Sequence, residues 1–336
     1  MKPKSIKSLL ALALLAPGVL FAQTTAKTTP VGYVSLGSST GAALPAETDI
    51  AISVPLLNQA VYSGSVGSLS GSDIVVAGAA FTASAYVAST PHIVEVTSGV
   101  KSGLIAVITA NTTNTVTVSV QPGDSLSGIA AGDTLSIRPA NTLSSLFAGN
   151  TLVDGVELLV WNNGTVEGDN LANDSSYVFF SGEWYDAGFE NANNAILYPG
   201  ESYVLRNSST TPITSLVVSG EVQVSKHRNV ISKLSATTAQ DTRFAHSNPA
   251  GELIGTSGYG FDDGDELVVF DNNATGMNKA GSSYFYFGGA WYDGGFEDVS
   301  TSFTLKGGQG YVYKRIATAA VGDTLVSDVV NYVPSL

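Results

Sequence analysis

Cysteine is absent from the 336-residue chain. Its absence excludes a disulfide framework, a zinc site built on thiolates and a cysteine nucleophile. Charged residues are scarce, at 13% of the chain, and the 28 acidic residues outnumber the 15 basic ones. The resulting formal charge of −13 argues against nucleic acid and anionic membranes as partners, because both would repel the protein.

Beyond its N-terminus the chain also lacks an uninterrupted apolar run of about eighteen residues, so no membrane-spanning helix is predicted. Residues 1–7 carry three lysines, and the apolar stretch that follows ends at Ala22. A basic start, a short apolar segment and a small residue at its end are typical of a secretory signal. We therefore predict that residues 1–22 are a signal peptide and that the protein is exported to the periplasm, the cell surface or the extracellular medium.

Strand-forming and turn-forming residues dominate what is present. Val, Thr, Ser, Gly and Asn are abundant, a composition that favours an all-β fold. Between residues 31 and 140, short β-branched runs alternate with glycines roughly every eight to twelve residues. This pattern is typical of a small antiparallel barrel or sandwich. We predict a first β module over residues 31–140.

The most informative feature is an internal repeat. Residues 175–190, SSYVFFSGEWYDAGFE, return at residues 282–297 as SSYFYFGGAWYDGGFE, with eleven of sixteen positions identical. Two small residues between aromatic runs predict an aromatic β-hairpin closed by a tight turn. Similarity on both sides extends the copies to about residues 155–207 and 264–315. We predict a duplicated β region over residues 141–336, whose copies pack around a pseudo-twofold axis with a shared core.

The hairpins supply the candidate ligand-binding residues. Flat aromatic faces stack on sugar rings and carboxylates bond to sugar hydroxyls, so a Trp-Tyr-Asp sequence is compatible with carbohydrate binding. The alternative is that the rings fill the core, because one face of a hairpin must be buried. The candidates are Trp184, Tyr185, Asp186, Trp291, Tyr292 and Asp293.

An acidic turn supplies the candidates for a metal site. Asp262, Asp263 and Asp265 lie close together in the chain, and calcium takes roughly six to eight oxygen ligands. Their spacing does not match the regular Asp-x-Asp-x-Asp-Gly calcium loop, so the alternative is that they keep the turn soluble. Calcium is the single cofactor for which the sequence offers candidates.

A catalytic constellation is not found. Residues 123–126, Gly-Asp-Ser-Leu, spell the nucleophile block of the GDSL esterases, but no histidine has an aspartate three residues before it to act as the base. A serine without a base is inert. The histidines show no zinc spacing: His92 fits a strand, and His227, between two basic residues, is predicted on a solvated face. We therefore predict a protein without enzymatic activity, with hydrolase as a remote alternative.

The chain resembles a family of uncharacterised secreted proteins from Verrucomicrobia and related bacteria. The resemblance runs over most of the mature chain in the same order, and it implies export and this layout without implying an activity. The matching segments are Thr97-Ser98-Gly99 with Gly103, residues 108–115, Ala131-Gly132-Asp133 with Ile137-Arg138-Pro139, and residues 284–287 with Gly289 and Trp291.

Two classes of function are therefore favoured. The first is a structural or surface protein of the cell envelope or extracellular matrix, which the composition and the duplication favour. The second is a module that binds carbohydrate or another polymer through the Trp-Tyr hairpins. Residues 31–36 form a β-run that is suited to pairing with a sheet edge of a second copy. The expected partners are thus the protein itself or an extracellular polysaccharide.

Overall fold

The computed structural model describes residues 29–336 except 225, 261, 323 and 329–336. The predicted signal peptide lies outside the described residues. Nearly all regular structure is antiparallel β, which confirms the predicted all-β class. None of the helices among the described residues is both long and apolar enough to cross a membrane.

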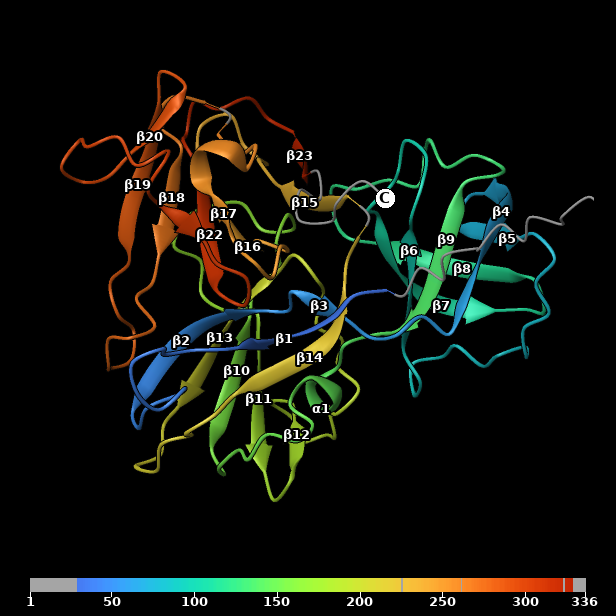
Figure 1. Ribbon diagram of the computed structural model, residues 1–336, viewed down its shortest axis with the longest axis horizontal. Coiled ribbons are helices and arrows are strands. Elements are labelled where there is room, and N and C mark those ends of the chain that lie inside the picture. Colours follow the sequence, from blue (N-terminus) through green and yellow to red (C-terminus); the bar gives the residue numbers. More distant parts are fainter. Residues whose placement is uncertain (1–28, 225, 261, 323, 329–336) are drawn as a thin grey trace, which may run out of the picture.

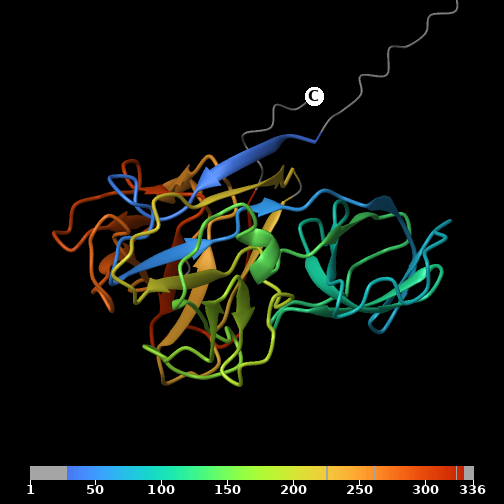
Figure 2. The same ribbon diagram turned by 90° about the horizontal axis from the view of Figure 1, so that it is seen from below.

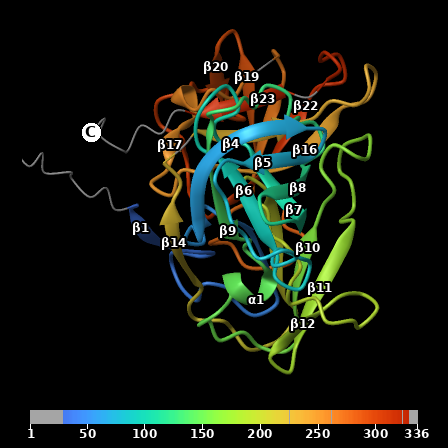
Figure 3. The ribbon, with the colours of Figure 1, turned by 90° about the vertical axis from the view of Figure 1, so that its right-hand side faces the viewer.

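A closed six-stranded antiparallel barrel forms the right side of Figure 1 and faces the viewer in Figure 3. Side chains point alternately inwards and outwards along its strands, and β-branched side chains such as Ile74, Val94 and Val116 fill the interior of the barrel. The barrel prediction is confirmed. Its strands are β4 (Tyr62–Ser70), β5 (Asp73–Val76), β6 (His92–Val96), β7 (Ile105–Asn111), β8 (Thr115–Val120) and β9 (Thr134–Pro139).

The barrel is inserted into the duplicated region and does not simply precede it. Residues 31–57 belong to the predicted first module, and this part of the prediction is wrong. They contribute β1 (Val31–Ser35), β2 (Thr48–Ser53) and β3 (Leu56–Leu57) to sheets of the duplicated region. The chain enters and leaves the barrel at neighbouring points, because the Asn58 amide donates to the carbonyls of Pro139 (3.2 Å) and Ala140 (3.1 Å). The barrel module therefore begins near Tyr62, and Figure 2 shows it beside the sheets.

The duplicated region contains two five-stranded sheets with the same strand order. In one the order is β12-β11-β10-β13-β2, and in the other it is β20-β19-β18-β22-β16. Both predicted hairpins are present, as β11–β12 and β19–β20. The bounds are β10 (Val156–Val160), β11 (Ser175–Phe180), β12 (Glu183–Tyr185), β13 (Ser202–Asn207), β16 (Gln240–Ala245), β18 (Glu266–Val269), β19 (Ser282–Phe287), β20 (Ala290–Tyr292) and β22 (Gly310–Arg315).

Shorter elements complete the described chain. Strand β14 lies between β1 and β3, and two further strand pairs, β15–β23 and β17–β21, are separate two-stranded sheets. The bounds are β14 (Val217–Val222), β15 (His227–Ile231), β17 (Glu252–Leu253), β21 (Thr304–Leu305), β23 (Thr324–Asp328), α1 (Leu143–Leu146) and the 3-10 helix η1 (Ile254–Thr256).

Each copy has its own core, so the prediction of one shared core is wrong. Trp184 and Tyr203 belong to the first core and Trp291 and Tyr311 to the second, each about 1% exposed. Helix α1 packs into the first core, as η1 does into the second. Truncating such a buried ring costs about 3–5 kcal/mol, so each hairpin is fixed by its own tryptophan.

The copies are instead joined by two loops, residues 161–174 and residues 270–281, which we call the clamp loops. Each crosses to the edge strand of the other copy. The Asn272 side chain accepts from the Ala51 N–H and donates to the Ala51 carbonyl, both at 2.8 Å. Asn163 does the same to Arg243, at 2.8 and 2.5 Å. A carboxamide carries an acceptor oxygen and N–H donors. Each asparagine side chain therefore bonds to the edge strand as a neighbouring strand would.

The exchange is reciprocal along both edge strands. The Asp49 N–H donates to the Gly276 carbonyl and the Asp241 N–H to the Gly168 carbonyl, both at 3.1 Å. Four residues further along each edge strand, the N–H groups of Ser53 and Ala245 donate to carbonyls of the opposite copy, at 3.0 and 2.9 Å. Every outward N–H of the two edges at these positions is thus paired across the pseudo-twofold axis.

We expect Asn272→Ala to lower the free energy of unfolding by about 2–4 kcal/mol, because it leaves the buried N–H and carbonyl of Ala51 unpaired. Urea denaturation followed by circular dichroism measures the change. The control is Asn194→Ala in an exposed loop, which should cost less than about 0.5 kcal/mol. Equal effects of the two substitutions would show that the clamps do not hold the copies together.

Candidate functional site

The hairpin tryptophans are structural. Trp184 and Trp291 are buried in the two cores, so they are not part of a solvent-facing sugar platform. Tyr185 and Tyr292 are half-buried beside them. Alternation along a short strand fixed this outcome, because the larger ring of each Trp-Tyr pair points into the core.

Asp186 and Asp293 shape the loop that follows each hairpin. The Oδ1 atom of Asp186 accepts from the N–H groups of Gly188 (2.8 Å) and Glu190 (2.9 Å). Asp293 makes the corresponding bonds, at 2.8 and 3.0 Å. These carboxylates hold their loops by side-chain-to-backbone bonding, as aspartates in turns do.

The loops that these aspartates hold display a phenylalanine that sequence reasoning missed. Phe189 and Phe296 are 65% and 84% exposed, and both have a φ of 62°. A left-handed backbone is unfavourable for a bulky residue, and it occurs at the same place in both copies because equivalent aspartate bonds hold both loops. Phe180 and Phe287, at the two hairpin turns, are also exposed, so each hairpin ends in an aromatic tip. The Gly-Phe-Glu sequence shared by both copies was the available signal.

The calcium candidates are engaged by protein donors. Asp262 forms an ion pair with Arg315, and Asp263 accepts from the Gly288 N–H at 2.9 Å. Asp265 is buried and accepts from the Ile316 N–H, also at 2.9 Å. Within the described residues, no cluster of three His, Cys, Asp or Glu side chains is arranged to hold a metal. These bonds give the acidic turn a structural role.

The Gly-Asp-Ser-Leu segment joins the barrel to the duplicated region. Asp124 forms ion pairs with Lys101 (3.1 Å) and Arg228 (3.3 Å) and accepts from the Ser125 N–H (2.7 Å). Burial alone would raise the pKa of Asp124, but these donors hold it below its ordinary value. The aspartate is therefore an anchor between two modules.

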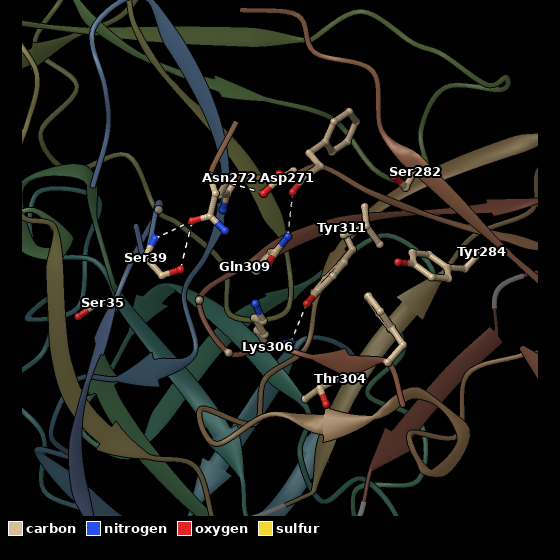
Figure 4. A pocket seen from close by; sticks show the side chains of 17 residues that line it. Ser35, Ser39, Asp271, Asn272, Ser282, Tyr284, Thr304, Lys306, Gln309 and Tyr311 are labelled. Carbon is tan, nitrogen blue, oxygen red and sulfur yellow. Dashed lines mark hydrogen bonds between the residues drawn. The ribbon is translucent and has the colours of Figure 1, made fainter. Parts of the chain in front are cut away.

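A cavity of about 300 Å³ lies at the base of the second hairpin, between β19, residues 303–311 and the segment after β1 (Figure 4). The hydroxyls of Ser35, Ser39, Ser282 and Thr304 line it. Its charged groups are one cation, Lys306, and one anion, Asp271, so the lining is close to neutral. Sequence reasoning missed this cavity because its walls come from segments far apart in the chain.

Tyr284 forms the aromatic wall of this cavity together with Phe303. The two ring centroids lie 4.4 Å apart at an interplanar angle of 36°. Burial, and then the charge of Asp293, raises the pKa of Tyr284, so its hydroxyl stays protonated at neutral pH.

Comparison of the chain with protein-family models, curated proteins and solved structures found no match.

His227 is buried, contrary to the solvated face that its basic neighbours predicted. It occupies an inward position of β15, about 2% exposed, while the side chain of Arg228 turns towards Asp124. Burial, together with the nearby His246, lowers the pKa of His227 to about 4. The ring is thus neutral in the folded protein at neutral pH.

This histidine should make stability depend on pH. Its unfolded pKa is about 6.5, so below that pH the unfolded chain binds a proton that the folded protein excludes. The stabilisation is fully present above pH 6.5 and is lost as the pH falls towards 4, by about 3 kcal/mol. Urea denaturation at pH 7 and pH 4.5 should therefore show a smaller loss for His227→Gln than for the wild type. Equal losses would contradict this assignment.

Proposed function

We propose that the protein is an exported surface or matrix protein without enzymatic activity, and that it binds a neutral carbohydrate polymer. The cavity in Figure 4 carries the proposal. The Tyr284–Phe303 wall offers an apolar face to a sugar ring, and the surrounding hydroxyls match its hydroxyl groups. Its volume is at the lower end of the range for small-molecule sites, which suits a single ring of a chain.

The choice of a neutral polymer follows from charge. Lys306 and Asp271 balance each other in the cavity, and the hairpin loop beside it carries Asp293 and Glu297. The whole chain has a formal charge of −13. An anionic polymer would therefore be repelled on approach, whereas a neutral one would not.

The exposed phenylalanines at the hairpin turns and in the loops that follow them extend the contact along a polymer. Phe287 and Phe296 are exposed on the hairpin unit that contributes Tyr284 to the cavity. The first hairpin, β11–β12, lies at the opposite end of the duplicated region from β19–β20, as Figures 1 and 3 show. Phe180, at its turn, and Phe189, in the loop that follows it, are exposed. Tips that lie at opposite ends suit the bridging of two polymer strands, which fits a matrix role and increases avidity.

Co-sedimentation with insoluble neutral polysaccharides, such as cellulose, chitin and β-glucan, tests the proposal. We expect Ser282→Trp to fill the mouth of the cavity and weaken binding at least about tenfold, which corresponds to about 1.4 kcal/mol. The matched control is Ser68→Trp on the exposed face of the barrel, which should bind as the wild type does. Pectate provides an acidic polymer for comparison.

Two outcomes would overturn this function. Unchanged binding by Ser282→Trp would remove the cavity from the account. Binding to pectate in preference to every neutral polymer would contradict the charge argument.

Self-association is a second candidate, favoured by β1. This strand lies at an edge of its three-stranded sheet, and Val31 and Tyr33 are 73% and 76% exposed. An exposed apolar edge strand is suited to pairing with another chain. If it does so, Tyr33→Lys should shift sedimentation velocity from oligomer to monomer; a wild-type monomer at high concentration would rule the candidate out.

A further inference from the structure

A second cavity, of about 280 Å³, lies between the two copies. Both copies build it, because its walls come from β2, β10, β13 and β16 and from both clamp loops. About half of the lining residues are apolar, among them Ile50, Leu159, Val204, Trp161 and Phe270. The charged groups of the lining are Arg206, Arg243, Lys279 and Asp49.

This lining carries three cations against one carboxylate, in a chain that is acidic as a whole. Arg206 is neutralised by Asp49, which it holds through Nε (2.8 Å) and Nη2 (2.9 Å). The Lys279 ammonium instead donates to two backbone carbonyls, those of Asp271 (2.8 Å) and Ala274 (2.6 Å). Among the described residues, neither Lys279 nor Arg243 forms an ion pair.

Arg243 breaks the symmetry of the two copies. Its counterpart on the other edge strand is Ala51, which the opposite clamp asparagine holds in the same way. The guanidinium lies 3.7 Å from the centroid of the Trp161 ring and 5.8 Å from that of Phe270. Burial lowers the pKa of Arg243 to about 10, although Asp241 opposes the shift, so the group remains charged at neutral pH.

A neighbouring cavity of about 370 Å³ shares Arg243 and Trp161 and carries the acids Asp174 and Asp241. Arg243 therefore lies between an acidic cavity and one in which cations are in excess. A desolvated cation is costly unless an anion faces it, and the cationic cavity lacks an unengaged carboxylate of its own among the described residues.

We propose that the cavity between the copies binds a small carboxylate with a flat apolar body. The carboxylate would lie against Arg243 and Lys279, and the body would pack on the apolar side chains of Leu159, Val204 and Phe270, because Arg243 already covers the face of Trp161. A guanidinium recognises a carboxylate through paired N–H donors, and the apolar walls favour an organic acid over a fully hydrated inorganic anion. The two cavities share Phe270 as a wall, but the polar residues that carry the two proposals are different.

Benzoate is the probe, and the full mature chain is titrated with it by calorimetry and by tryptophan fluorescence. Trp161 is the one tryptophan of three that lies outside the two cores and lines this cavity, so its emission should change on binding. Benzamide has the same ring without the charge, and inorganic phosphate has the charge without the ring. We expect benzoate to bind at least about tenfold more tightly than either, as a charge-assisted contact implies.

Four variants separate the contributions. Arg243→Gln should weaken benzoate binding at least about tenfold, and Lys279→Met serves the same purpose if the first variant does not fold. Trp161→Phe copies the residue of the other repeat, so it should abolish the fluorescence change while calorimetric binding persists. Ser282→Trp, in the carbohydrate cavity, should bind benzoate as the wild type does.

Four results would overturn the site: no binding of benzoate, equal binding of benzamide, tighter binding of phosphate, or an unchanged affinity in a folded Arg243→Gln or Lys279→Met variant. Loss of polysaccharide binding alone would leave benzoate binding intact, so this site and the proposed function fail separately.

Discussion

The duplicated region depends on one interaction, the pairing of an asparagine side chain with the outer edge of the other copy's sheet. An edge strand presents N–H and carbonyl groups that must find partners when they are buried. Asn272 supplies them to Ala51, and Asn163 supplies them to Arg243. Because each copy completes the other, the two sheets form one unit although their cores are separate.

Both cavities follow from this arrangement. The clamp loops leave their own sheets to reach the opposite edge. Residues of both copies line the cationic cavity, whereas the second copy and residues 35–39 line the near-neutral one. Asn272 and Asn273 border the near-neutral cavity, while Trp161 and Lys279 border the cationic one. The duplication is thus the reason that one protein carries a near-neutral cavity and a cationic cavity close together. The barrel lies away from both cavities. The chain enters and leaves it at adjacent points near Asn58.

The repeat in the sequence was sufficient to predict the hairpins, since glycine in the turn and alternating aromatics are local signals. It was not sufficient to place β2, which pairs with β13 across the whole inserted barrel and carries no mark of that partner. Nor could it tell which aromatic of each hairpin faces the core: Trp184 is buried whereas Phe180 is exposed. The burial of His227 could not be predicted because its neighbours in the sequence are charged. Burial alternates along β15, so a charged neighbour can face solvent while His227 faces inwards.

Native-state hydrogen exchange at the two edge strands tests the reciprocal clamp most directly. The outward amides are those of Asp49, Ala51 and Ser53 on β2 and those of Asp241, Arg243 and Ala245 on β16. If the clamps hold the copies as one unit, both sets should exchange only through the same large opening, with equal protection and equal dependence on denaturant. Rapid exchange at either edge, while the inner strands β10 and β18 stay protected, would contradict the account.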